Sequence, residues 1–198
     1  RIDTRKCTFK QGCQNLDSIR IPRSVTNIGS GAFQFCNRLN ARISDLTAWC
    51  GISFGDNTAN PLYFTRKLYL NDSLITDLII PEQVTSIGDY AFVGCRGLKS
   101  VKIPNSVTSI GGSAFSDCSS LSSIEILNGV VSIGNFAFSN CSNLSSIAIP
   151  NSVTSIGARA FNNCSTLTSV EIPNSVISIG NFAFYSCSEL TSITIPDS

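Results

Sequence analysis

The chain has 198 residues, a formal net charge of +1 and a charged fraction of 14%. This near-neutral balance gives no broad attraction to nucleic acid or to acidic membranes, and we expect neither nucleic-acid binding nor membrane insertion. The chain also lacks His, the commonest general base and a common metal ligand. No combination of residues points to a catalytic site, a metal site or a cofactor, so we do not expect an enzyme.

A repeat begins at Cys13, after an irregular start. The first unit runs through L-D-S-I-R-I-P and S-V-T-N-I-G to A-F-Q-F-C, and it ends at Cys36, 23 residues after Cys13. A fixed period of about 20 to 50 residues is typical of proteins built from stacked coils. The chain is therefore expected to be a solenoid.

Residues 44–73 interrupt the period. This insert holds the only Trp, Trp49, an additional cysteine, Cys50, and the loop F-G-D-N-T-A-N-P. The pair Asn71-Asp72 lies between two apolar runs and predicts a β-hairpin. The loop lacks the D-x-D-x-D-G series of a calcium site, so we interpret it as a polar turn.

From Ile75 onward the unit recurs regularly. In one such unit the alternation of Ile147 and Ile149 predicts a short strand, and Pro150 marks where its pairing stops. Gly157 suits a tight corner or a positive φ angle. The spacing of the Ala-Phe pair and of the Cys and Leu after it predicts a short helical or 3₁₀ return.

Because one coil cannot bury its apolar side alone, equivalent residues should stack as ladders between coils. The expected phenylalanine ladder contains Phe33, Phe92, Phe115, Phe138, Phe161 and Phe184. The expected cysteine ladder contains Cys13, Cys36, Cys95, Cys118, Cys141, Cys164 and Cys187. Neither end has the polar cap that a solenoid needs. We therefore expect residues 1–198 to be a single domain taken from a longer array, and the open ends leave room for end-to-end self-association.

The cysteine count is nine, an odd number, and the chain contains no C-x-x-C pair, which disfavours a zinc site. We interpret the ladder cysteines as buried free thiols, with occasional disulfides between neighbouring coils as the alternative. Cys7 and Cys50 lie outside the ladder. They are the better candidates for a capping disulfide or a reactive thiol.

The phrase L-x-S-I-x-I-P-N-S-V-T-S-I-G-x-x-A-F-x-x-C-S resembles the BspA-like family of leucine-rich repeat surface proteins. The irregular segment I-S-D-L-T-A-W-C-G-I-S-F-G strengthens the resemblance. It implies an α/β repeat solenoid of the leucine-rich repeat class. Parallel β-strands would form the concave face, short helical or 3₁₀ returns the convex face, and the insert would contain a hairpin.

Two surfaces are candidates for binding a partner. The outward strand positions should line the concave face with small polar residues and sparse charges; the candidate residues there are Arg20, Asp77, Ile79, Lys102, Glu125 and Glu171. The alternative is a solvated face whose partner docks elsewhere. The aromatic residues of the insert form the second candidate, with Trp49, Phe54 and Tyr63, unless Trp49 simply replaces a ladder Phe.

The resemblance implies a cell-surface or secreted, adhesin-like module that binds an extracellular or host-surface protein, for example a matrix protein. The runner-up is a structural spacer or receptor-like segment of a larger surface protein, with no ligand on this part. An enzyme is the third class, which the missing His and the absence of a convergent motif disfavour.

Overall fold

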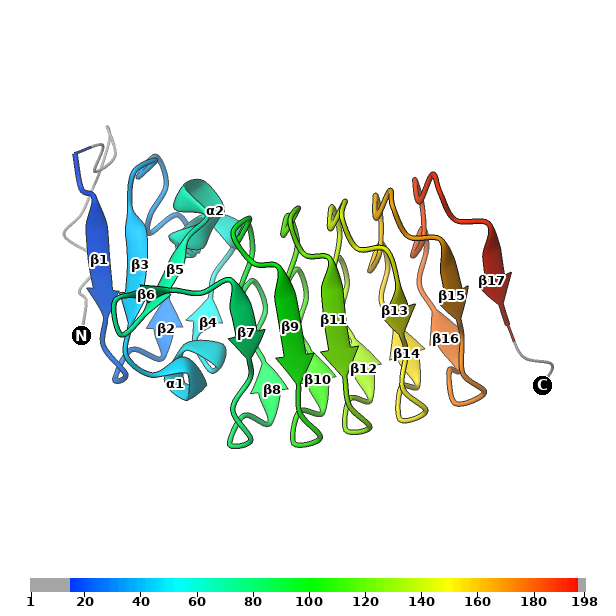
Figure 1. The fold of residues 1–198 in the computed structure, drawn as a ribbon. Coiled ribbons are helices and arrows are strands. Elements are labelled where there is room, and N and C mark those ends of the chain that lie inside the picture. Colours follow the sequence, from blue (N-terminus) through cyan, green and yellow to red (C-terminus); the bar gives the residue numbers. More distant parts are fainter. Residues whose placement is uncertain (1–14, 196–198) are drawn as a thin grey trace.

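The computed structural model describes residues 15–195, which form a parallel β-solenoid (Figure 1). Its front row consists of β1 (Ser18–Ile21), β3 (Asn40–Ile43), β5 (Leu68–Leu70), β7 (Asp77–Ile79), β9 (Ser100–Ile103), β11 (Ser123–Ile126), β13 (Ile147–Ala148), β15 (Ser169–Glu171) and β17 (Ser192–Thr194). A second row consists of β2 (Asn27–Ile28), β4 (Ser53–Phe54), β8 (Ser86–Ile87), β10 (Ser109–Ile110), β12 (Ser132–Ile133), β14 (Ser155–Ile156) and β16 (Ser178–Ile179). The interruption adds α1 (Leu46–Cys50), the 3₁₀ helix η2 (Asn57–Ala59), α2 (Leu62–Thr65) and β6 (Ser73–Leu74).

From β7 onward, the paired front strands are parallel and follow the 23-residue register that the repeat predicts. Ser100 faces Ser123, and Ser169 faces Ser192. The pairing divides the row into three ladders, β1-β3-β5-β6, β7-β9-β11 and β13-β15-β17. The predicted repeat solenoid is therefore confirmed.

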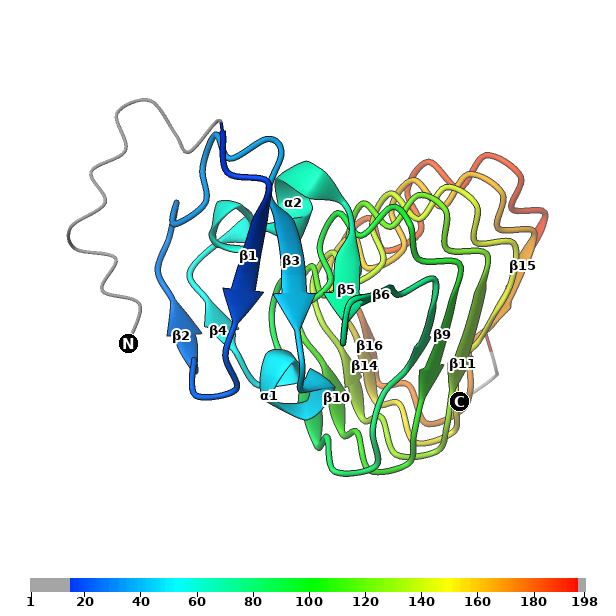
Figure 2. The same cartoon turned by 60° about the vertical axis from the view of Figure 1, so that its left-hand side comes forward.

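The predicted hairpin in the insert is also confirmed. β5 and β6 pair antiparallel, with Tyr69 facing Leu74. The φ angles of Asn71 and Asp72 are 49° and 66°, and left-handed angles at both central residues belong to a type I′ hairpin turn. Figure 2 shows β6 between β5 and the ladder that contains β9.

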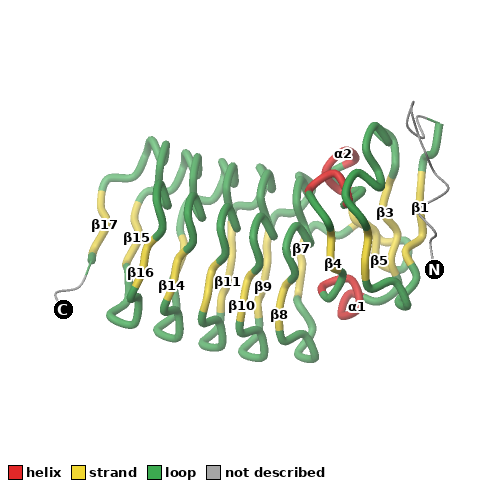
Figure 3. The backbone as a smooth tube through the Cα atoms, turned by 180° about the vertical axis from the view of Figure 1, so that it is seen from behind, coloured by secondary structure: helices red, strands yellow, loops and turns green. Residues whose placement is uncertain are grey.

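The S-I-G phrase, for which the sequence predicted only a corner, forms a second parallel ladder. Ser109 pairs with Ser132 and Ile110 pairs with Ile133, in the unbroken order β16-β14-β12-β10-β8. Figure 3 shows this row from behind. Neighbouring regular coils are thus paired at both strand positions, except that β11 and β13 do not pair in the front row.

The glycine after each of these strands is needed for close packing. The φ angle of Gly157 is not positive, so that part of the prediction is wrong. A Cβ on Gly157 would lie 2.5 Å from the backbone carbon of Gly134, and a Cβ on Gly180 would lie 2.3 Å from the nitrogen of Ala158. Side chains of L-residues cannot fit there without a backbone shift, so the prediction of a tight corner is correct.

The returns are series of turns rather than continuous helices. Hydrogen bonds of the i→i+3 kind recur, such as Ser116 to Ser113 at 3.2 Å, which gives the returns their local 3₁₀ character. Two residues in each regular coil interrupt them with positive φ, for example Ser113 (54°) and Asp117 (61°). Their N–H groups donate to the next coil, as from Asp117 to Ser139 at 2.8 Å. Bonding between coils therefore replaces the i→i+4 bonds of a helix.

The phenylalanine ladder lies at the centre of the core. The rings of Phe92, Phe115, Phe138, Phe161 and Phe184 stack nearly parallel, with centroids 5.2–5.4 Å apart. Phe33 is buried, but its N–H donates to Thr58 of the insert, which lies between it and the stacked rings. The stacked series therefore begins at Phe92, later than predicted.

The ladder cysteines are free thiols, as predicted. Those from Cys36 to Cys164 are buried and Cys187 is half-buried, while Cys7 and Cys13 lie outside the described residues. The thiols of the regular coils donate to carbonyl oxygens of the neighbouring coil, as from Cys141 to Phe115 at 3.3 Å. Burial raises the pKa of Cys164 to about 12, so these thiols act as small apolar groups.

Candidate functional site on the strand face and the insert

The pairing register gives the outward residues of the front row in order. We call this surface the strand face. One line of residues across it contains Arg20, Arg42, Tyr69, Ile79, Lys102, Glu125, Ala148, Glu171 and Thr194. All six strand-face candidates predicted from the sequence lie on this face and are exposed. Arg42 was missed because the repeat unit that ends at its strand is one residue shorter than the others, so that Ser18 pairs with Asn40, 22 residues later.

The hairpin brings a cluster of side chains together at the N-terminal part of this face. We call Arg20, Arg42, Tyr69, Asp72, Leu74 and Ile79 the hairpin cluster. Arg20 Nη2 lies 3.1 Å from Asp72 Oδ1, and Arg42 Nη1 lies 2.7 Å from the same oxygen. The hydrogen bonds from both guanidinium groups lower the pKa of Asp72 below its usual value. Asp72 is therefore ionised at neutral pH and holds the two arginines in place.

Aromatic and aliphatic groups complete the hairpin cluster. The Arg42 guanidinium lies 4.7 Å from the centre of the Tyr69 ring, within range of a cation–π contact. Leu74 pairs across from Tyr69 and is 41% exposed, and Ile79 on the next strand is 69% exposed. Exposed aliphatic side chains thus lie beside an ordered array of charges.

The remaining strand-face candidates are largely occupied by one another or by serine. Lys102 and Glu125 form an ion pair of 3.2 Å with both side chains about half exposed, a type of pair that contributes little to stability. Asp77 accepts a hydrogen bond from Ser100, which lowers the pKa of that carboxyl. Glu171 lies in an open depression of about 640 Å³. These residues share a face but form no single cluster.

Two of the insert candidates are core residues, and their prediction as binding residues is wrong. Trp49 is 1% exposed and Phe54 is 5% exposed, with ring centroids 5.4 Å apart. Trp49 Nε1 donates to the carbonyl of Ala91 at 2.9 Å, and Asn60 Nδ2 donates to the same oxygen at 3.0 Å. The irregular coil cannot present regular backbone donors here, so these two side chains satisfy the carbonyl of the first regular coil.

Cys50 is also a core residue. It is 1% exposed, and burial is the main cause that raises the pKa of its thiol to about 12. A thiol in this state is not nucleophilic at neutral pH, so the suggestion of a reactive or capping cysteine at this position is wrong. Asp56, in the same insert, accepts hydrogen bonds from Thr58 and from the N–H of Ala59, as expected for a polar turn.

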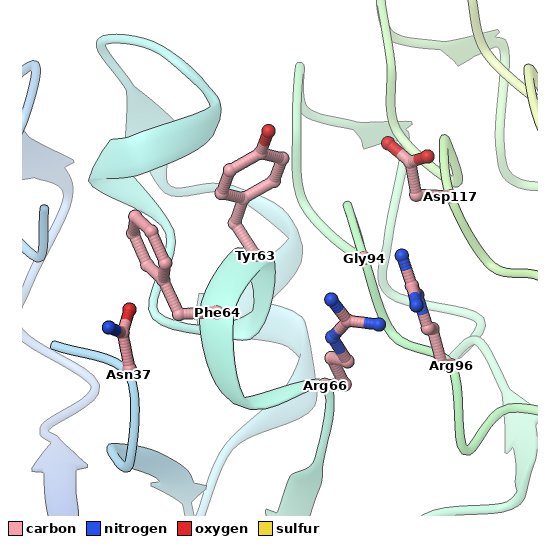
Figure 4. Close-up of a pocket in the computed structure, with 7 residues that line it drawn as sticks. All are labelled: Asn37, Tyr63, Phe64, Arg66, Gly94, Arg96 and Asp117. Carbon is pink, nitrogen blue, oxygen red and sulfur yellow. The ribbon is translucent and has the colours of Figure 1, made fainter. Parts of the chain in front are cut away.

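Tyr63 is the insert candidate that remains half-buried at the surface. Tyr63 is one of the residues that line a depression of about 380 Å³ next to α2. The lining residues are Asn37, Tyr63, Phe64, Arg66, Gly94, Arg96 and Asp117 (Figure 4). We call this the α2 pocket. The rings of Tyr63 and Phe64 pack edge to face with centroids 5.2 Å apart. Phe64 belongs to the aromatic residues of the insert that the sequence offered as a candidate surface, whereas the remaining lining residues were not singled out from the sequence.

Within residues 15–195, no group of three or more Cys, Asp or Glu side chains could hold a metal ion. No helix in this part of the chain is long and apolar enough to cross a bilayer.

Several solved structures are similar to the chain. A leucine-rich repeat protein of Treponema pallidum is 38% identical with a TM-score of 0.60, over 61% of this chain and 59% of its own. A leucine-rich cell surface protein of Faecalibacterium prausnitzii is 28% identical with a TM-score of 0.69, over 94% and 61%. A Bacteroides ovatus leucine-rich repeat protein, 24% identical with a TM-score of 0.55 over 89% and 60%, shows the same fold.

These matches span about three-fifths of the length of each solved relative. Among curated proteins, none matches the chain significantly. The model of the BspA-type leucine-rich repeat region matches in six copies, over residues 4–52 and 64–191. The chain belongs to the BspA-type leucine-rich repeat family.

Proposed function

We propose that the chain is a non-enzymatic, surface-exposed or secreted module that binds an extracellular protein, and that the hairpin cluster is the centre of the contact. The main support is composition. The cluster combines two arginines, a tyrosine and two exposed aliphatic residues, on a face that is otherwise mostly serine, threonine and alanine. Arg and Tyr are enriched among the few residues that carry most of the binding energy in interfaces.

The cluster is also ordered before any partner arrives. Asp72 fixes the guanidinium groups of Arg20 and Arg42, and Tyr69 packs against the latter. Ordered side chains lose less conformational entropy on binding. Arg20 remains 72% exposed, which leaves its other N–H groups free to reach an acidic or carbonyl-rich partner surface.

The surface-exposed or secreted location of the protein is proposed on two grounds. These are the family resemblance and the relative from Faecalibacterium prausnitzii that is described as a cell surface protein.

A binding assay against immobilised extracellular-matrix proteins tests the proposed function. We expect Arg20→Glu and the double variant Leu74→Asp with Ile79→Asp each to lower affinity at least about tenfold. Deleting residues 52–67 would not be a fair test, because Phe54 and other core residues of the insert would be lost.

The matched control is the double variant Lys102→Glu with Glu125→Lys, which exchanges the partners of an ion pair on the same face and keeps the net charge. We expect it to bind within about twofold of the unmodified chain, as exposed pairs contribute little. If only this control loses binding, the partner contacts β9 and β11 and not the hairpin cluster, which would contradict the proposal.

The second candidate is a structural spacer. The strand face over β11–β17 favours it, because its outward residues are small and polar, including Ser123, Ser146, Ala148 and Ser169. Binding of a longer protein that contains these coils, with no binding by this part, would support the spacer.

A further inference from the structure

We propose that the α2 pocket binds an acidic saccharide, with Arg66 and Arg96 holding its carboxylate or sulfate group. The pocket lies on the returns, away from the hairpin cluster, and uses none of the residues of that cluster. Figure 4 shows the two guanidinium groups next to each other on one side of α2, with Phe64 and Asn37 on the other side.

The charges of the pocket call for an anionic group. Within residues 15–195, Arg20, Arg38 and Arg42 each lie within 4 Å of an aspartate, whereas Arg66 and Arg96 form no ion pair. Two neighbouring guanidinium groups repel each other. A planar carboxylate or a sulfate would relieve this repulsion and accept paired hydrogen bonds from them.

The backbone holds both arginines in place without a ligand. Arg66 ends α2 at a φ angle of 69°, its N–H donates to Leu62, and its carbonyl accepts from Gly97, the residue after Arg96. Gly94 also has a positive φ angle, of 72°, and a Cβ there would lie 3.0 Å from the Cα of Tyr63. This close approach fixes α2 against the first regular coil, so the backbone that carries both arginines is in place before a ligand binds.

Other groups in the pocket favour a saccharide over a free anion or an acidic peptide. Tyr63 is half-buried, packs edge to face against Phe64, and offers aromatic surface to the apolar face of a sugar ring. The Asn37 amide and the Asp117 carboxylate can bond hydroxyl groups. Asp117 would repel a ligand with many negative charges, and the volume of about 380 Å³ suits a small ligand.

The test is an NMR titration of the intact chain with sialyllactose and a sulfated disaccharide, against neutral lactose, sodium sulfate and an oligoglutamate peptide. We expect the acidic saccharides to bind most tightly, and Arg66→Gln with Arg96→Gln to weaken them at least about tenfold. Tyr63→Ala should weaken them at least about threefold.

Arg159→Gln is the matched control. Its guanidinium lies 5.6 Å from the Phe136 ring and 5.4 Å from the Phe182 ring, but no second arginine accompanies it. We expect its affinity to stay within about twofold of the unmodified chain. Unchanged binding by the Arg66 and Arg96 double variant, equal binding of lactose, equal binding of sulfate alone, or tighter binding of the peptide would each overturn the proposal. Melting curves of every variant verify that the fold is kept.

Discussion

At the scale of the residue, the stacked phenylalanines from Phe92 to Phe161 are among the largest fully buried side chains of the core. Phe138 has no exposed surface and lies between two equivalent rings at 5.4 Å. Replacing a buried Phe by Ala removes its apolar contacts and leaves a cavity.

We predict that Phe138→Ala lowers the free energy of unfolding by about 3–5 kcal/mol, measured by urea denaturation. Phe136→Ala is the control two residues away, because Phe136 is 38% exposed. Phe136→Ala should lower the free energy of unfolding by less than about 1 kcal/mol. Equal losses in the two variants would show that the ladder does not carry the stability assigned to it.

The cysteine ladder makes stability depend on pH. Thiols that are free in the unfolded chain ionise near pH 9.0, whereas burial raises the pKa of Cys95 and Cys164 to about 12 in the folded chain. Below pH 9 the thiols keep their protons in both the folded and the unfolded state, so the free energy of unfolding does not change with their ionisation. Above it the unfolded state releases protons that the folded state retains, so stability falls as the pH rises toward 12.

We therefore predict that the free energy of unfolding falls with a steepening slope above about pH 9. Tyrosines also titrate at high pH, so the comparison that isolates a thiol is the Cys164→Ala variant. Its slope should be shallower than that of the unmodified chain, in urea titrations at matched pH values. Parallel slopes would exclude the thiol as a cause.

At the scale of the element, the corner glycines determine how closely coils can stack. Gly157→Ala would force a Cβ against the backbone of the preceding coil at 2.5 Å. We predict a loss of at least about 2 kcal/mol in the free energy of unfolding, measured by thermal denaturation. Gly29→Ala is the control at the same repeat position, because a Cβ on Gly29 meets no atom within 4 Å. If Gly157→Ala and Gly29→Ala lower the free energy of unfolding by the same amount, the close approach between coils is not the reason that glycine is required.

The strands of the front row and the hairpin could be predicted because their cause is local, whereas the second row of strands was predicted only as a corner. Alternating isoleucines mark the buried face, and Asn71-Asp72 forms a turn that most other residue pairs would not. The returns could not be predicted in the same way. The spacing of Ala, Phe and Cys also fits one side of a helix, but the N–H groups of residues such as Asp117 bond to the next coil. The carbonyl group that accepts this hydrogen bond lies about one repeat further along the chain, so the local residue pattern does not indicate it.

The candidate site could be predicted only in part for the same reason. Exposed positions on the strand face follow from alternation, and Arg20 and Ile79 were found this way. Arg42 was missed because the repeat unit before its strand is one residue short. Trp49 and Phe54 were assigned to an exposed loop, but packing of that loop against the first regular coil buries them.

At the scale of the whole molecule, regular coils form a scaffold, and the features that differ from coil to coil gather at the insert. The hairpin cluster lies on the strand-face side of the insert, and the α2 pocket lies on the returns beside it. The strands β5 and β6 and the helix α2, which carry these sites, can be followed in Figures 1 and 2. At the repeated positions, side chains form ladders of hydrogen bonds and stacked rings between coils. Side chains at the surface of the insert do not take part in these ladders and can contact a ligand, which is why both proposals concern the insert.

The most direct test of this account is hydrogen–deuterium exchange of the chain with and without a matrix protein that it binds. The account predicts new protection in residues 68–79, which form the hairpin and the strand after it, and little change in residues 144–195. Protection confined to residues 144–195 would contradict it.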